Sequence, residues 1–241
     1  MIRYQELGGA RIGFTRCRPA QHDATERPSE PNYGLSTRDQ RNLVLADRRA
    51  LTRQLGRPIA WMKQIHSDIV CHVSAETVSD ENSVTADAVI VDETIGAAVQ
   101  VADCIPILMA DPQTRRAAAV HAGRAGVELN IVARTITRLV ETGTSAQDLS
   151  VAVGPSICGS CYEVPREMME EFTREHPQAK TRSRWGSDAL DLRAVVEAQL
   201  AQCGVRQIIH DRTCTFESTK LNSYRRNRHC GRQVGWIYFP S

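Results

Sequence analysis

Three features are scarce in this sequence of 241 residues, and each scarcity excludes a class of protein. The net charge is only +2, so no strong field attracts the chain to nucleic acid or to an anionic membrane. Aromatic residues make up 5% of the chain, too few for an extended base-stacking surface. No apolar run approaches the ~20 residues of a membrane-spanning helix. We therefore expect neither a nucleic-acid-binding protein nor a membrane protein.

We also expect no export signal, because residues 1–14 lack the basic-then-apolar order of a signal peptide. The eight cysteines are therefore expected to be reduced, and most are interpreted as small buried side chains. Apolar residues (41%) and charged residues (24%) are present in ordinary globular proportions. These features predict a globular, cytoplasmic protein, which we expect to be a monomer.

The hydrophobic pattern predicts a mixture of helices and strands. Strands are expected at residues 11–16, 59–73, 86–91, 97–110, 117–121, 149–153, 207–211 and 234–238, and helices at 38–55, 126–141, 165–175 and 192–203. A polar, proline-containing loop is expected to be exposed over residues 19–36. No repeat or linker divides the chain, so the pattern predicts a single α+β domain over residues 1–241 with a large sheet core.

Three short motifs place reactive side chains near the ends of predicted strands, where loops commonly carry function. They are Gln64-Ile65-His66-Ser67, Asp103-Cys104-Ile105-Pro106 and His121-Ala122-Gly123. If the first motif is extended, Gln64 and His66 share a face. Because Pro106 has no N–H, Asp103 and Cys104 are expected at a strand end or on an edge strand.

The two histidines and the cysteine of these motifs form a candidate zinc set. Catalytic zinc usually takes three protein ligands and keeps one position open. However, the long separations between His66, Cys104 and His121 match no local zinc motif. From spacing alone the simpler interpretation is favoured, in which the histidines are ordinary core or surface residues and Cys104 fills space.

Two other segments carry weaker signals. Cys158-Gly159-Ser160-Cys161 is a CxxC pair, but no second pair accompanies it and no helix is predicted at its first cysteine. We interpret this pair as loop packing. The basic run over residues 224–229 is typical of either a local anion site or a solvated loop.

In this order the motifs resemble the family called multicopper polyphenol oxidase (laccase-domain) or purine nucleoside phosphorylase proteins. The other matching segments lie along almost the whole chain: Gly13 to Arg16, Val44 to Leu51, Ala86-Asp87-Ala88, Gly154 to Ile157, Cys161 to Val164, Ser223 to Arg226, and Gly231 to Gln233. The resemblance implies a layered α/β/β/α fold with a mixed β core. It also implies one zinc ion, or alternatively copper, bound by His66, Cys104 and His121.

The resemblance further implies an enzyme that cleaves purine nucleosides with phosphate and deaminates adenosine. The expected substrates are adenosine, inosine and S-methyl-5'-thioadenosine. Arg48, which matches a family position, is expected to bind phosphate, with Arg124 as second candidate, because guanidinium groups fit phosphate bidentately. Cys104 and Asp103 are expected to be catalytic, Asp103 by orienting water or a ligand ring, although it equally suits a strand-end cap.

Gln64 is expected to hydrogen-bond the substrate or a ligand, the alternative being a buried amide. One departure from the family pattern follows His121: in place of H-A-G-W-R-G this chain has His-Ala-Gly-Arg-Ala-Gly, so tryptophan is absent and arginine comes one position earlier. This departure leaves the substrate preference open.

Three alternative functions remain at this stage. A copper-dependent polyphenol oxidase needs more histidine ligands than the seven histidines of this chain, which form no H-x-H pair. A metal-free hydrolase would use Cys104 as nucleophile and His121 as base. A non-catalytic binding module is supported only by the altered segment at Arg124.

Overall fold

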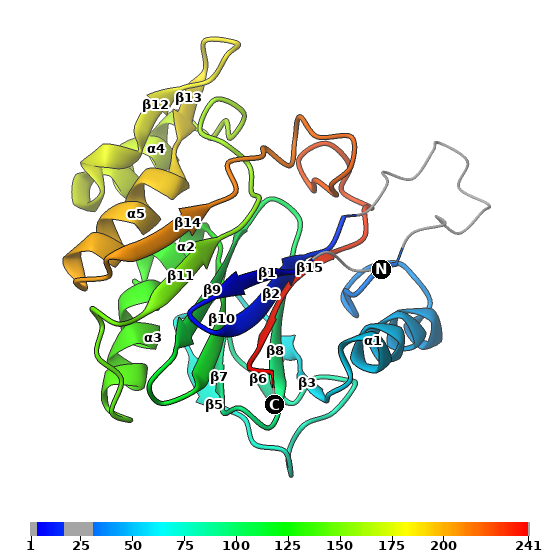
Figure 1. Cartoon of the computed structure of the whole chain (residues 1–241). Helices are drawn as coiled ribbons and strands as arrows, with labels where there is room; N and C mark the ends of the chain where they lie inside the picture. The colour runs from blue at the N-terminus through cyan, green and yellow to red at the C-terminus, as the bar shows by residue number, and fades with distance from the viewer. Residues whose placement is uncertain (1–3, 17–30, 241) are drawn as a thin grey trace.

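Two β-sheets form the core of the computed structural model, which describes residues 4–16 and 31–240 (Figure 1). In this part of the chain, the five-stranded sheet has the order β1 (Gln5–Leu7), β2 (Ala10–Phe14), β15 (Gln233–Tyr238), β8 (Gly96–Val101) and β3 (Ile59–Ala60). The six-stranded sheet has the order β14 (Gln207–His210), β11 (Ser150–Val153), β9 (Ile105–Asp111), β10 (Arg116–Ala122), β7 (Ala88–Val91) and β5 (Val70–His72).

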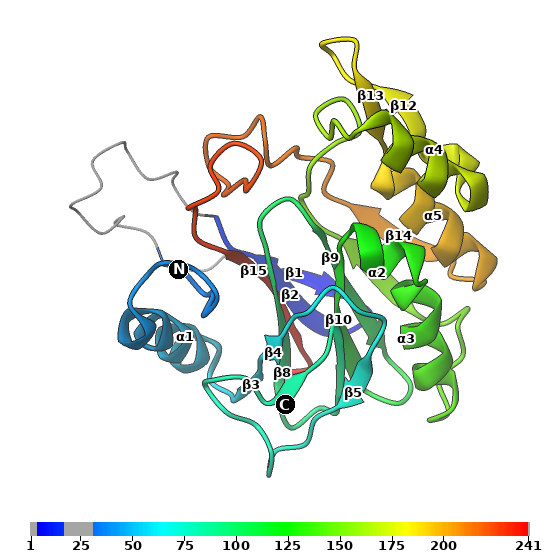
Figure 2. The same cartoon turned by 180° about the vertical axis from the view of Figure 1, so that it is seen from behind.

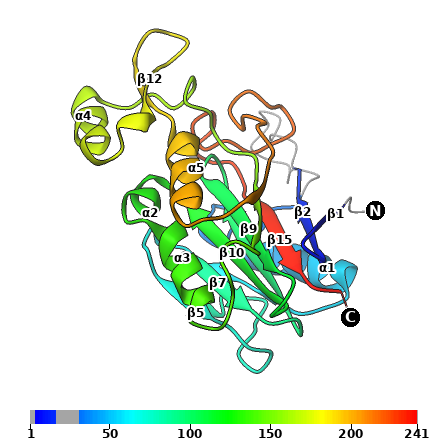
Figure 3. The same cartoon turned by 60° about the vertical axis from the view of Figure 1, so that its left-hand side comes forward.

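Helices cover both outer faces of this pair of sheets. The helices are α1 (Arg41–Leu55), α2 (Arg124–Glu128), α3 (Ile131–Val140), α4 (Arg166–Glu175) and α5 (Leu192–Gln202), with a short 3-10 turn at Pro177–Ala179. Helices α2, α3 and α5 lie on the six-stranded sheet, and α1 lies beside the five-stranded sheet; the layers follow one another in Figure 3, and Figure 2 shows α2 and α3 from behind. The predicted α/β/β/α arrangement is thereby confirmed.

Strand β9 shows how one segment serves two of these layers. All seven of its residues are buried, and its side chains alternate between two apolar clusters. Ile107 and Met109 pack with the helices, whereas Leu108 and Ala110 pack against the opposite sheet. Because both faces of the strand are covered, its sequence is almost continuously apolar. Two short pairs complete the described strands: β4 (Met62–Lys63) with β6 (Val84–Thr85), and β12 (Lys180–Arg182) with β13 (Asp188–Leu190).

The predicted element boundaries were wrong in three places, each for a local backbone reason. The strand predicted at 97–110 is two strands, because Asp103 has a positive φ of 87° and turns the chain between β8 and β9. The helix predicted at 126–141 is divided into α2 and α3 by Asn130, whose φ is 62°. The run at 59–73 contains three short strands rather than one. Of the loop predicted at 19–36, residues 19–30 lie outside the described residues.

The hairpin of β9 and β10 brings two of the sequence motifs together. Its register pairs Pro106 with His121 and Ile105 with Ala122. Asp103 and Cys104 therefore lie at a strand end, as Pro106 predicted, although β9 is an inner strand of the sheet rather than an edge. Across the described residues, the chain has no helix that combines the length and the hydropathy of a membrane span.

Candidate metal centre

The side chains of His66, Cys104 and His121 converge at the end of the β9–β10 hairpin. One potential ligand atom from each of them lies within 4.8 Å of the other two. Nε2 of His66 is 3.9 Å from Sγ of Cys104, and the two imidazole rings meet edge to face with centroids 4.7 Å apart. The structure thus brings together the three residues that spacing alone did not connect.

Asp87, which directly precedes β7, positions both histidines. Its fully buried carboxylate accepts backbone N–H hydrogen bonds from Ile65, His66 and Ser67, and a further bond from the Ser67 hydroxyl. These bonds curl the loop, and His66 adopts a positive φ of 61°. The segment is therefore not extended, and the condition under which Gln64 and His66 would share a face is not met.

The carboxylate of Asp87 also determines the orientation of His121. Nδ1 of His121 lies 2.8 Å from Oδ1 of Asp87, and because an ionised carboxylate only accepts, this nitrogen carries the proton. Nε2 is then the nitrogen left for the cluster. A carboxylate that fixes the tautomer of a histidine ligand in this way is a common feature of metal sites.

The electrostatics of the cluster favour a thiolate beside charged imidazole. Burial raises the pKa of Cys104, but the charge of His121 and hydrogen bonds from His121 and His66 outweigh burial, and the pKa falls. Burial lowers the pKa of His121, but Cys104 and Asp87 outweigh it, and this pKa rises. Burial likewise raises the pKa of Asp87, and hydrogen bonds from His121 and Ser67 reverse the shift. A thiolate is the form of cysteine that binds metal.

Gly123 lets the backbone approach the cluster closely. A Cβ at this position would lie 2.8 Å from Cδ2 of His66 and 3.2 Å from Sγ of Cys104. A Cβ here would push on the side chains of His66 and Cys104, so the packing of the cluster favours glycine. Two imidazoles and one thiolate, crowded together and held by a buried carboxylate, are a donor set that fits Zn²⁺.

Asp103 anchors the C-terminal loop beside the cluster. Oδ1 accepts a hydrogen bond of 2.6 Å from the Thr215 hydroxyl, and Oδ2 accepts one of 2.7 Å from the backbone N–H of Arg225. Both carboxylate oxygens are thus used within the protein. This arrangement favours the capping interpretation over a free catalytic carboxylate, since Asp103 holds the loop next to Cys104.

Two guanidinium groups and one phenol lie close to the cluster. Arg124 follows Gly123 directly, and its Nη1 is 3.0 Å from Glu128. The guanidinium of Arg225 lies over the Tyr162 ring, 5.2 Å from its centroid. Burial and the nearby Cys104 raise the pKa of Tyr162, whereas Arg124 and Arg225 lower it, so all four groups share one neighbourhood.

Arg48 and Gln64 were predicted to contact the substrate or a ligand, but both side chains are hydrogen-bonded within the protein. Nε2 and Oε1 of Gln64 hydrogen-bond the backbone O and N of Gln100, so the amide links the loop to β8. The Arg48 side chain is fully buried beneath α1 and donates to backbone oxygens, which are those of Tyr33, Asp80 and Glu81. This corrects the expectation that Arg48 binds phosphate, because its guanidinium is inaccessible and already paired.

A cavity of about 850 Å³ lies elsewhere, between β2, the end of β11 and the segment after β14. Phe14, Pro155 and Leu221 are among its lining residues, and none of the three cluster residues lines it. The candidate metal centre is therefore not at the bottom of this cavity, although Thr213, which lines it, lies two residues before Thr215, whose hydroxyl donates to Asp103.

Comparison with known proteins identifies the family. The family described as multi-copper polyphenol oxidoreductase laccase matches residues 16–240. The chain belongs to this family. Among its relatives is a protein named purine nucleoside phosphorylase from Streptomyces coelicolor, 38% identical over 237 residues that cover 96% of each chain. Another of the same name, from Mycobacterium tuberculosis, is 36% identical over 212 residues, 86% of this chain and 84% of that protein.

The fold of the family has also been seen in solved structures. The Neisseria meningitidis protein NMB0706 superposes with a TM-score of 0.84 at 25% identity, covering 100% of this chain and 99% of its own. The resemblance predicted from the motifs is thereby confirmed at the level of family and fold.

Sequence reasoning assigned no role to three residues that the structure places at the centre: Asp87, Tyr162 and Arg225. Asp87 had a usable signal, since an acidic residue between alanines in an otherwise apolar strand is buried and needs partners. Arg225 lies in the basic run over residues 224–229, which the sequence left open as an anion site, whereas Tyr162 had no such signal; only the fold brings both beside Cys104.

Proposed function

We propose that this protein is a zinc-dependent purine nucleoside phosphorylase. The observation that carries the proposal is the convergence of His66, Cys104 and His121, with the guanidinium groups of Arg124 and Arg225 in the same neighbourhood. A cationic surface of this kind beside a metal centre suits a substrate pair that includes phosphate. The names of the relatives support the same reaction.

His66, Cys104 and His121 are the proposed ligands. When bound, a Zn²⁺ ion supplies Lewis acidity and positive charge at this position. Asp87 holds a proton on Nδ1 of His121 and leaves Nε2 as the nitrogen that faces the cluster. Gly123 keeps the space between the ligands free of side-chain atoms.

The remaining groups act on the substrates. In phosphorolysis a phosphate oxygen attacks C1′ of the ribose, the N-glycosidic bond breaks with its electron pair going to the purine, and the purine takes a proton. Arg225 and Arg124 bind and orient the phosphate, since guanidinium pairs with two phosphate oxygens at once. The Tyr162 ring, with Arg225 over one face, contributes an aromatic surface beside the reacting atoms. Asp103 holds Arg225 in place through its backbone N–H.

The test is an assay of purified, zinc-loaded protein with phosphate and each of adenosine, inosine and S-methyl-5'-thioadenosine. We expect release of the free base and ribose-1-phosphate (or its methylthio analogue), and a loss of at least about a thousandfold in kcat/KM for Cys104→Ala, because a metal ligand is removed. Cys71→Ala is the matched control, since Cys71 in β5 is a free cysteine outside the cluster. Absence of phosphorolysis with all three nucleosides would reject the proposal.

We propose adenosine deamination as a second activity of this site. The same assay, run with phosphate omitted, measures it through the formation of inosine from adenosine.

A metal-free cysteine hydrolase is favoured by one observation, the lowered pKa of Cys104 beside His121. Removal of the metal with a chelator separates the zinc-dependent phosphorylase from the metal-free hydrolase, because it abolishes phosphorolysis but leaves a cysteine nucleophile active. Copper loading with a phenolic substrate tests the oxidase alternative. The cytoplasmic location and the monomeric state stay predictions.

A further inference from the structure

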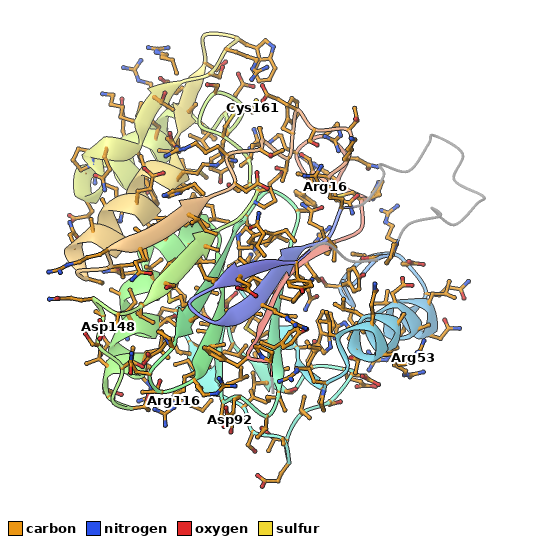
Figure 4. All side chains as sticks on the ribbon, viewed as in Figure 1. Arg16, Arg53, Asp92, Arg116, Asp148 and Cys161 are labelled. Carbon is orange, nitrogen blue, oxygen red and sulfur yellow. The ribbon has the colours of Figure 1, made fainter. Side chains whose placement is uncertain are left out.

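A second group of sulfur atoms lies outside the candidate metal centre. Sγ atoms of Cys158, Cys161 and Cys214 are all within 4.8 Å of one another. Cys161, labelled in Figure 4, and Cys158 lie on the loop after β11, whereas Cys214 follows β14, 56 residues after Cys158. Cys161 and Cys214 are buried, and Cys158 is half-buried. The CxxC pair packs in an apolar cluster with Ile157 and Phe216, as interpreted from the sequence, and the fold adds the third thiol of Cys214 to it.

The backbone holds these thiols together. The N–H of Cys158 donates to Sγ of Cys214 at 3.4 Å, and the N–H of Cys161 donates to the carbonyl of Cys158 at 3.0 Å, which closes a tight turn. Ser156 and Cys214 form a parallel bridge between the two segments. An N–H that donates to a sulfur stabilises its thiolate form. The cluster is thus a built arrangement of ligands from two segments.

A buried cation lies next to the cluster. Arg193 of α5 is only 9% exposed, and its acceptors among the described residues are a hydroxyl and carbonyl oxygens, those of Ser156, Arg212 and Thr213. Metal-bound thiolates at Cys158 and Cys214 would place negative charge beside this buried guanidinium, which neutral thiols do not.

We propose that Cys158, Cys161 and Cys214 bind a thiophilic d10 metal ion, Zn²⁺ or Cu⁺, in a structural site separate from the His66–Cys104–His121 centre. Binding displaces one proton from each thiol, forms three metal–sulfur bonds and transfers no electrons. Thiolate ligands select these ions over the harder Mg²⁺ and Ca²⁺. Three sulfurs complete the coordination of Cu⁺, and Zn²⁺ takes one further ligand.

The position of this site gives it a structural role. The loop of the CxxC pair also carries Tyr162, and the segment after Cys214 leads to Arg225. Both segments are bonded to Asp103: the N–H of Ile157 donates to its carbonyl at 2.9 Å, and the Thr215 hydroxyl donates to its carboxylate. An ion that joins the two segments holds Tyr162 and Arg225 beside the first centre.

Metal stoichiometry of the reduced, full-length protein tests this inference, with Zn²⁺ and anaerobic Cu⁺ as separate arms. We expect about two ions per chain for the unaltered protein and for the control Cys71→Ala, and about one for Cys214→Ala and for Cys104→Ala. The double variant of Cys104 and Cys214 is expected to bind essentially none. The ion that gives the second equivalent identifies the metal of the thiol cluster.

No loss of bound metal in Cys214→Ala relative to the unaltered protein would overturn the inference. So would a disulfide among the three cysteines in protein alkylated before any reduction. If Cys214→Ala does not fold, X-ray absorption spectroscopy of the metal-loaded unaltered protein tests the inference by counting the sulfur ligands per metal ion. The first centre alone gives about one sulfur ligand per ion, and a second site with three thiolates raises that average clearly.

Discussion

Oδ1 of Asp87 lies 2.8 Å from Nδ1 of His121, and both side chains are buried. The same carboxylate accepts the backbone N–H of His66 at 3.0 Å. One residue therefore orients the ring of one histidine and the loop of the other. The geometry of the candidate metal centre depends on a residue that is not itself a proposed ligand.

We expect Asp87→Asn to weaken zinc affinity by about 10- to 100-fold, the usual effect of losing a partner that orients a histidine ligand. Asparagine has nearly the same volume, but one oxygen becomes an NH₂ donor that faces N–H groups. Affinity is measured by competition with a chromophoric chelator.

Asp111→Asn is the matched control, because Asp111 is also a fully buried carboxylate that accepts a backbone N–H and a hydroxyl, at the opposite end of β9. We expect it to lower the free energy of unfolding without changing zinc affinity. Equal zinc affinities in the two variants would contradict the role of Asp87.

Gly123→Ala introduces a Cβ 2.8 Å from the His66 ring. We expect reduced zinc affinity with a nearly unchanged melting temperature, because the strain falls on a loop histidine rather than on the core. Gly143→Ala is the comparison. Its φ of 98° strains an alanine, but the added Cβ meets no atom within 4 Å, so the free energy of unfolding falls and the zinc affinity does not. A Gly123→Ala protein that binds zinc normally would show that His66 is free to move.

Much of this fold could be predicted from the sequence, because buried strands such as β9 and β10 are almost continuously apolar and the helices are punctuated by proline, glycine and aspartate. The candidate metal ligands were predicted from ordered motifs and not from spacing, since His66 and Cys104 meet only in the folded chain. The third thiol at Cys214 was missed for the same reason. Such contacts depend on strand register, which local patterns do not specify.

At Arg48 the sequence pattern led to a predicted function that the structure does not support, whereas at Cys214 it missed a contact. A position that matches a family pattern was expected to bind phosphate, yet burial decides its role: its guanidinium lies 4.3 Å from the Trp61 ring centroid and is bonded to carbonyl oxygens. The sequence pattern does not distinguish an arginine that holds a loop from one that binds a ligand. Only the surroundings of the side chain make that distinction.

We therefore expect Arg48→Lys to lower the free energy of unfolding by about 3 kcal/mol, because lysine leaves buried carbonyl oxygens without donors. The KM for phosphate is expected to stay unchanged. Arg49→Lys is the control on the same helix, where an exposed pair with Asp80 is worth about 0–1 kcal/mol. Denaturant unfolding and steady-state kinetics measure the two quantities. A raised phosphate KM with unchanged stability would restore Arg48 as a phosphate ligand.

Arg225→Ala separates phosphate binding from loop structure. The substitution removes the guanidinium over Tyr162, together with its Nη1 hydrogen bond to the carbonyl of Glu163, but keeps the backbone N–H that donates to Asp103. We expect the phosphate KM to rise about tenfold, equivalent to about 1.4 kcal/mol, with a small change in melting temperature. Arg228→Ala, an exposed arginine of the same loop, is the control and is expected to leave both unchanged. If the two variants behave alike, Arg225 contributes general positive charge rather than a specific contact, and Arg124 becomes the remaining phosphate ligand.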